Sequence, residues 1–229
     1  MALISDLVSA IAEVEGVPEA TVSLAARYAR EAGFLSQGAR GRNAPRATVA
    51  DCANLLIAVN ASGCVVKDVP QAITMFRRLQ LHVAHGGRDA RLHSVQYHDI
   101  ESAKLSFLDR PGATFGEMLE AIIERFIGRE LETFMLDEAL KYVDTARVRE
   151  KFGDDEDGAL IRIIESTKSF LRLGTVRFDI NFHRPSPYAE LSVTRSVGAT
   201  KETLAGANFM VTVEDMESGP SRMVAIGAT

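Results

Sequence analysis

The chain has 229 residues, 46% of them hydrophobic and 25% charged, and its 26 basic and 31 acidic side chains give a net charge of −5. That balance is ordinary for a globular protein with a core and excludes bulk disorder. No apolar run approaches the roughly 18 residues of a membrane span, and the N-terminal segment lacks the basic region of a signal peptide. From the lack of such an apolar run we expect no membrane partner. Cys52 and Cys64 are too few for a disulfide scaffold, so we expect a cytoplasmic protein.

The first 62 residues predict a group of short helices. Apolar side chains recur at helical spacing over residues 3–14, and Gly16 follows as a natural helix end. A second helix is predicted over 18–32, with a proline in its first turn. A loop rich in glycine, residues 36–45, then leads to a third helix over 48–59, whose first threonine suits an N-cap.

The following part of the chain predicts a mostly helical middle. Helical spacing of apolar residues predicts one helix over 70–83 and another over 114–127, the latter capped by its first threonine. Residues 129–149 are predicted to be helical in part, and 159–170 to be helical. This middle is acidic, since residues 99–170 carry 17 acidic and 10 basic side chains.

Near residue 176 the periodicity changes to that of strands. Residues 176–182 alternate apolar and polar side chains, as do residues 189–194, and the Pro-rich segment 184–187 between them predicts the turn of a β-hairpin. Further strands are predicted at 209–213 and 223–226. We therefore expect an α+β protein made of a helix-turn-helix domain, residues 1–62, and a second α+β unit for oligomerisation or sensing, residues 66–229.

Basic charge gathers in the N-terminal domain and predicts a DNA contact. Between residues 26 and 48 five arginines face the single acid Glu31, an imbalance that favours a polyanion or an acidic partner surface. Two arginines three positions apart share one face of the second helix, hydroxyls near its start reach phosphates or bases, and arginines of the 36–45 loop serve as a wing or arm on phosphates. The predicted DNA contacts are Thr21, Ser23, Arg27, Arg30, Arg40, Arg42 and Arg46.

A short run after the second helix carries a resemblance. Its sequence is Glu31-Ala32-Gly33-Phe34-Leu35, and it resembles the step that ends the recognition helix of winged-helix and MerR-like regulators. The likeness covers about residues 3–60. The same segment is similar in texture to uncharacterised phage-related proteins of alphaproteobacteria, which implies a regulator or DNA-handling factor of a phage or prophage and transfers no catalytic residues. The alternative is a plain helical core with a solvated basic face.

Other patterns give weaker hypotheses. Four histidines, His82, His85, His93 and His98, fall within 17 residues, and the first two have a spacing that can share a metal on a helix. Because no cysteine or carboxylate pattern completes a site, a second basic patch with Arg77, Arg78, Arg88 and Arg91 is favoured over a metal centre. No nucleophile elbow, phosphate loop or dinucleotide fingerprint occurs, so we expect neither enzyme activity nor a cofactor.

Three functions follow as hypotheses. The first is a sequence-specific transcriptional regulator that binds double-stranded DNA as a homodimer, because one helix-turn-helix reads only a few base pairs. The apolar face of the hairpin also needs a cover, which either helices or another chain would supply, and we expect the homodimer to form through residues 66–229. The second is a phage DNA-packaging or structural protein, like a small terminase subunit. The third is an enzyme or ligand sensor within residues 66–229.

Overall fold

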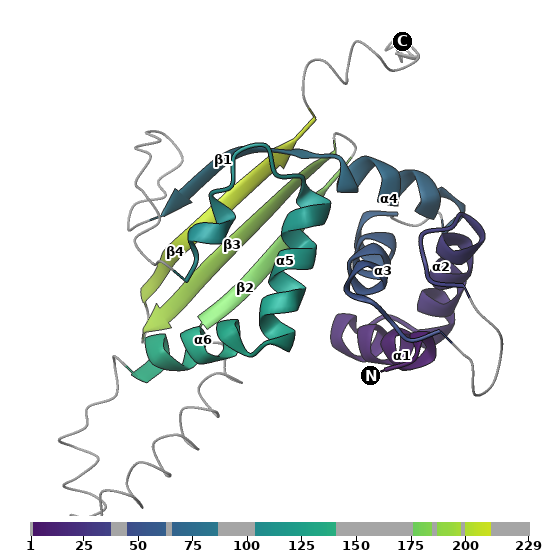
Figure 1. The fold of residues 1–229 in the computed structure, drawn as a ribbon, viewed down its shortest axis with the longest axis horizontal. Coiled ribbons are helices and arrows are strands. Elements are labelled where there is room, and N and C mark those ends of the chain that lie inside the picture. The colour runs from purple at the N-terminus through teal and green to yellow at the C-terminus, as the bar shows by residue number, and fades with distance from the viewer. Residues whose placement is uncertain are drawn as a thin grey trace, which may run out of the picture.

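The computed structural model describes residues 2–37, 45–62, 66–86, 104–140, 176–184, 187–197 and 200–211. Within these ranges the chain combines six α-helices with one antiparallel sheet of four strands, which confirms the predicted α+β class. Figure 1 shows helices α1 to α4 gathered at one end of the molecule and the sheet at the other, with α5 and α6 lying on one face of the sheet. The helices are α1 (Ile4–Glu15), α2 (Glu19–Glu31), α3 (Val49–Ala61), α4 (Val69–Arg77), α5 (Phe115–Ile127) and α6 (Glu130–Leu140); the strands are β1 (Gln80–Gly86), β2 (Val176–His183), β3 (Tyr188–Val197) and β4 (Thr200–Met210).

The predicted ends of three helices, in the N-terminal part and in the middle of the chain, are confirmed by cap geometry. The hydroxyl of Thr48 accepts a hydrogen bond from the backbone N–H of Asp51 at the start of α3, and Thr114 does the same for Glu117 in α5. Gly16 ends α1 with a φ of 64°, a conformation that glycine adopts without steric cost.

The prediction of one helix over 70–83 is wrong in its second half. Helix α4 ends at Arg77, and residues 80–86 form strand β1 instead. Strand β1 pairs antiparallel with β4, from Gln80 opposite Met210 to Gly86 opposite Ala205. The backbone of 80–86 therefore satisfies its hydrogen bonds through a distant segment, and that tertiary pairing overrides the local helical spacing.

The predicted hairpin is confirmed, and it forms one edge of the sheet. The strand order is β1-β4-β3-β2, with Phe178 opposite Val193 and Ile180 opposite Leu191 in the hairpin. The strand predicted at 209–213 is wrong in its bounds, since β4 runs from Thr200 to Met210. The interior of β4 is rich in alanine and glycine, which lack the β-branched side chains typical of strands. The strand predicted at 223–226 lies outside the described residues.

Aromatic side chains of α5 cover the apolar face of this sheet. The ring of Phe115 lies 5.6 Å from that of Phe182 and 5.4 Å from that of Phe209, measured between ring centroids. Near the other end of α5, Phe126 and Phe178 are 5.3 Å apart. The hairpin face, for which the sequence predicts a cover of either helices or another chain, is thus covered by a helix of the same chain.

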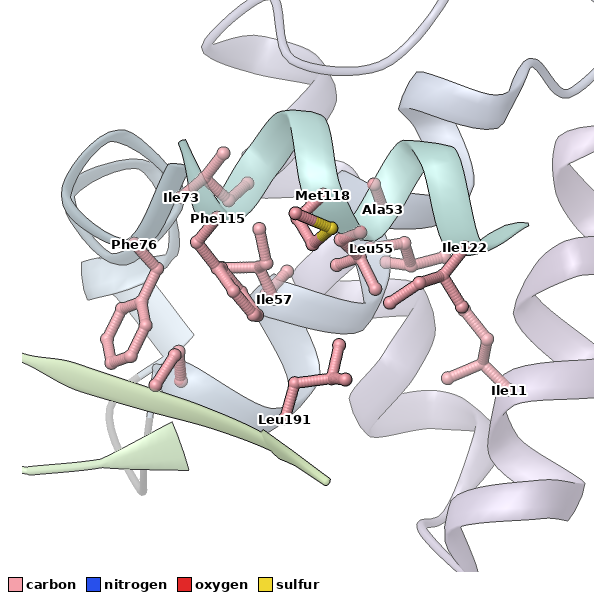
Figure 2. Close-up of a cluster of buried hydrophobic side chains, with 14 of the residues drawn as sticks. Ile11, Ala53, Leu55, Ile57, Ile73, Phe76, Phe115, Met118, Ile122 and Leu191 are labelled. Atoms are coloured by element: carbon pink, nitrogen blue, oxygen red, sulfur yellow. The ribbon is translucent and has the colours of Figure 1, made fainter. Parts of the chain in front are cut away.

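Helix α3 lies at the centre of the molecule and joins its two ends. Five of its apolar residues are fully buried: Ala53, Leu55, Ile57, Ala58 and Ala61. Figure 2 shows Leu55 and Ile57 of α3 gathered with Met118 and Ile122 of α5 and with Leu191 of β3. One hydrophobic core therefore runs across the predicted division between residues 62 and 66, and the division into two domains stays a prediction.

Candidate nucleic-acid interface

Helices α1 and α2 are joined by a turn of three residues, Gly16 to Pro18. In Figure 1, α1 lies along the base of the helical end and α2 rises beside it, far from the sheet. The buried side of α2 consists of small residues, Val22, Ala25, Ala26 and Ala29, each at most 3% exposed. Small side chains let the helices approach closely, and they leave the opposite side of α2 exposed.

The exposed side of α2 brings together some of the predicted DNA contacts and leaves one apart. Ser23, Arg27 and Arg30 are all exposed, and at about 100° per residue they lie within roughly 60° of one another around the helix. Thr21 is exposed too, but it lies roughly 160° from Ser23 by the same geometry. Thr21 therefore cannot point into the same DNA groove as Ser23, Arg27 and Arg30.

The charge of this side is balanced within α2 itself. The guanidinium of Arg27 donates to the carboxylate of Glu31 at 2.7 Å, and this hydrogen bond raises the pKa of Arg27 above its ordinary value. Glu19 accepts a hydrogen bond from the Ser9 hydroxyl at 3.2 Å. Since α2 holds two acids and two arginines, the local excess of positive charge comes from the arginines of the following loop.

That loop is fastened on both sides of its undescribed part. Before it, the backbone N–H and the hydroxyl of Ser36 donate to Asp51 at 2.7 and 2.8 Å. After it, Arg46 forms a β-bridge with Leu3, and its side chain is exposed. Arg40 and Arg42 lie outside the described residues. Because both ends of the loop are held against α1 and α3, Arg46 lies near the N-terminus of α1.

Asp51 is a structural residue that the sequence analysis does not identify. It is 2% exposed, and besides Ser36 it accepts hydrogen bonds from the backbone N–H and hydroxyl of Thr48 at 2.8 and 2.7 Å. Burial by itself would raise the pKa of Asp51, but the hydrogen bonds from Thr48 and Ser36 hold it below the ordinary value. The spacing of Thr48 and Asp51 is that of a capping box, so this pattern could have identified the residue.

The segment that carries the family resemblance ends α2 in a specific way. The backbone N–H of Gly33 donates to the carbonyl of Arg30 at 3.0 Å, and that of Phe34 donates to the carbonyl of Ala29 at 2.8 Å. With Gly33 at a φ of 81°, these two bonds make a Schellman motif. Many helices end in this way, so helix termination alone accounts for the glycine and the apolar residue that follows it.

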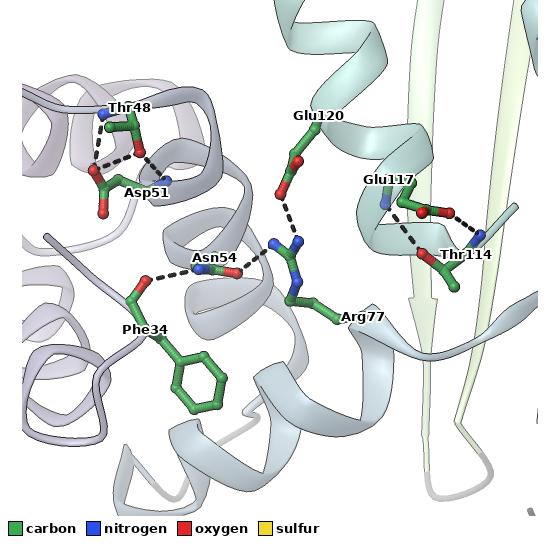
Figure 3. A network of polar contacts seen from close by, with 8 residues as sticks. All are labelled: Phe34, Thr48, Asp51, Asn54, Arg77, Thr114, Glu117 and Glu120. Carbon is green, nitrogen blue, oxygen red and sulfur yellow. Dashed lines mark hydrogen bonds and ion pairs between the residues drawn. The ribbon is translucent and has the colours of Figure 1, made fainter.

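Arg77 takes part in a network between helices, which corrects its place in a second basic surface patch. Its side chain is 28% exposed and donates to Glu120 of α5 at 2.5 Å and to Asn54 of α3 at 2.7 Å. The amide of Asn54 in turn donates to the backbone carbonyl of Phe34 at 2.7 Å. Figure 3 shows Arg77 between Asn54 and Glu120, with Phe34 beyond Asn54.

The metal spacing suggested for His82 and His85 assumes a helix, and the structure does not place them on one. Both lie on strand β1, so the helical spacing that suggested a shared metal does not apply to them. His93, His98, Arg88 and Arg91 lie outside the described residues. Among the residues that are described, no three histidine, cysteine or carboxylate side chains are grouped as metal ligands.

A hollow lies between α5 and the short 3₁₀ helix η3 (Ser106–Leu108). Its volume is about 330 Å³, and its walls carry charges of both signs, among them Arg110, Glu117 and Arg125. The guanidinium of Arg125 lies 4.1 Å from the centroid of the Phe107 ring. Glu117 is committed to capping α5, where the Thr114 N–H donates to it at 2.9 Å. The hollow thus offers a mixed, open surface without a convergent set of polar groups.

Comparisons of the chain with protein-family models, with curated proteins and with solved structures return no match. None of the helices in the described ranges has both the length and the apolar character needed to cross a bilayer. The arrangement of exposed groups on α2 is therefore the observation from which a function can be argued.

Proposed function

We propose that the chain binds double-stranded DNA through the exposed side of α2, as a cytoplasmic transcriptional regulator of phage or prophage type. The observation that supports this function is the group of Ser23, Arg27 and Arg30 on one side of a helix that follows α1 after a three-residue turn. A helix whose polar side is exposed can enter the major groove of DNA. One arginine guanidinium can donate two hydrogen bonds at once to a guanine or to a phosphate.

Binding would replace one ion pair by another. Arg27 is held by Glu31 in the free protein, so it would exchange that carboxylate for a phosphate or a base edge. Both side chains are exposed, at 72% and 55%, and exposed pairs of this kind contribute little to stability. The exchange is therefore feasible, and Glu31 would disfavour DNA that offers Arg27 no better partner.

The loop arginines would add phosphate contacts. Arg46 is exposed at the base of the loop, and we propose that it contacts phosphate together with Arg40 and Arg42. Contacts to phosphate fix the register of a protein on DNA, whereas contacts to base edges select the sequence. We also propose a homodimer, because paired helices spaced by one turn of DNA read a longer site than one helix alone.

The test is duplex binding by the double variant Arg27→Ala/Arg30→Ala. The matched control is Arg110→Ala/Arg129→Ala, which removes two exposed arginines from the sheet end of the molecule; Arg129 is paired with Glu132 at 2.9 Å much as Arg27 is with Glu31. We expect the first variant to lose specific binding and the control to keep it. For the binding that remains, the slope of log K against the logarithm of the salt concentration should become shallower by about one unit for each phosphate that an arginine no longer neutralises. The proposal fails if the wild-type chain binds no duplex in gel shifts at roughly 50–200 mM salt, or if both double variants bind alike.

A further inference from the structure

A chain of hydrogen bonds runs from α5 to Phe34, just after the end of α2. Glu120 of α5 accepts from Arg77 at 2.5 Å, and the other terminal nitrogen of Arg77 donates to the side-chain oxygen of Asn54 at 2.7 Å. The side-chain nitrogen of Asn54 donates to the carbonyl of Phe34 at 2.7 Å. Because the guanidinium can only donate and the carbonyl can only accept, the amide of Asn54 has a single satisfactory orientation.

The end of this chain of bonds lies beside a proposed DNA contact. The N–H of Phe34 closes α2 on the carbonyl of Ala29, and the carbonyl of Arg30 accepts from Gly33 and from the side chain of Gln37 at 3.0 Å each. Phe34 is thus tied on one side to the turn that carries Arg30 and on the other to Asn54. Asn54 is 6% exposed, so water competes little for its two bonds.

The packing around Arg77 makes its position sensitive to α5. A Cβ placed on Gly116 of α5 would lie 3.1 to 3.2 Å from three side-chain atoms of Arg77. Helices α4 and α5 therefore approach each other across the Arg77 side chain, and a shift of α5 would move the guanidinium that holds Asn54.

We infer that Arg77 and Asn54 are positioning residues for the DNA-facing helix: they transmit the position of α5 to the end of α2 that carries Arg30. This inference rests on the proposed function for its consequence in DNA binding. Its structural part, the dependence of the α2 terminus on Arg77, stands on the contacts alone and can be measured without DNA.

The discriminating variant is Asn54→Asp. An aspartate can still accept from Arg77, but it cannot donate to Phe34, and it sets a carboxylate oxygen against that carbonyl. Asn60→Asp is the charge-matched control on the same helix, since the amide of Asn60 donates to Leu56 within α3, at 3.1 Å. Arg77→Met is a second variant, which leaves the Asn54 to Phe34 bond in place and removes the link to α5.

Two measurements are made on the full-length chain. The first is hydrogen exchange of the Gly33 and Phe34 amides, which we expect to be about tenfold or more faster in Asn54→Asp and Arg77→Met and unchanged in Asn60→Asp. The second is duplex affinity, which we expect to fall about tenfold in the same two variants, because a smaller fraction of molecules holds α2 in the binding position. The effects of the two variants should also fail to add when they are combined, since both act through one chain of bonds.

The outcomes separate this inference from the proposed function. If neither Asn54→Asp nor Arg77→Met changes amide exchange at 33–34, the inference is overturned whatever the DNA result. If exchange increases while a DNA-binding wild type keeps its affinity in both variants, the positioning role is overturned and the proposed function stands. If the wild type binds no DNA, the proposed function falls, and the exchange measurement alone decides the structural part. Should Asn54→Asp fail to fold, Arg77→Met decides.

Discussion

Replacing Asp51 by asparagine should destabilise the chain in a way that depends on pH. One oxygen of Asp51 accepts from the Ser36 hydroxyl and from both the N–H and the hydroxyl of Thr48, and the other accepts from the Ser36 N–H. An asparagine whose oxygen takes the place of the busier atom leaves its NH₂ group facing the Ser36 N–H. The partly buried N–H of Ser36 then has no acceptor, and the side chain at position 51, which takes part in the capping box of α3, loses its charge.

The expected loss at pH 7 is about 2 to 3 kcal/mol, from the unsatisfied donor together with the weakened cap. For a chain of this size that corresponds to a shift of about 1 M in the urea midpoint. The control is Asp6→Asn, because Asp6 is exposed and accepts a single hydrogen bond, from Leu3 at 2.9 Å. We expect that variant to lose at most about 1 kcal/mol.

The dependence on pH follows from the lowered pKa of Asp51. A carboxyl whose pKa is lower in the folded state stabilises that state fully above its unfolded pKa, about 3.9. This contribution is lost as the pH falls through the folded value. The difference in unfolding free energy between wild type and Asp51→Asn should therefore be constant from pH 7 to pH 5 and shrink below about pH 4. A difference no larger than that of Asp6→Asn, or one that persists unchanged at pH 3, would refute the reasoning.

Three further predictions concern other parts of the molecule. Gly116→Ala should lower the temperature of thermal unfolding, although alanine favours a helix over glycine by about 1 kcal/mol, because its Cβ meets the Cβ, Cγ and Nε atoms of Arg77. Combining it with Arg77→Ala, which removes two of these three atoms, should recover part of that gain. Glu138→Ala should lower the free energy of unfolding by about 3 kcal/mol, because Arg195, 6% exposed, loses the buried carboxylate to which it donates; the double variant Glu138→Met/Arg195→Met should recover part of that loss in urea titrations. Light scattering of the full-length chain at micromolar concentrations should give the mass of a dimer; a monomeric mass contradicts the predicted homodimer, and a ring-sized mass favours the packaging hypothesis.

Light scattering needs the whole chain, because the hydrophobic core includes helix α3. A fragment that starts after residue 66 would lose α3, which packs on α5 through fully buried residues such as Leu55 and Ile57. Such a fragment would expose an apolar surface that the whole chain covers, and it would associate for that reason alone. Its mass would say little about the native assembly.

The sequence predicts elements well where the local pattern and the tertiary contacts agree. Thr48 and Thr114 mark helix starts because the cap is a local interaction, and the alternation over 176–182 identifies β2 because one of its faces is buried under α5. The pattern fails at 80–86, where pairing with β4 decides the structure, and at β4, where small residues such as Ala205 and Ala207 fill the interior without a strand pattern. The spacing of Thr21 and Ser23 does predict that they fall on opposite flanks of a helix, since they are two positions apart, so grouping both as contacts to one groove is an avoidable error of the prediction.

The strand order of the sheet has a consequence for the way the chain reaches its fold. Strand β4 is the neighbour of both β1 and β3, so β1 has no partner in the sheet until residues 200–210 have left the ribosome. Helices α1 to α3 are close in sequence and can associate early, whereas closing the sheet requires a contact between Gln80 and Met210 and so a large loss of chain entropy. Contacts of such long range slow folding. A chain that ends before Thr200 would lack the strand that joins β1 to the hairpin, and part of the apolar side of α5 would be uncovered.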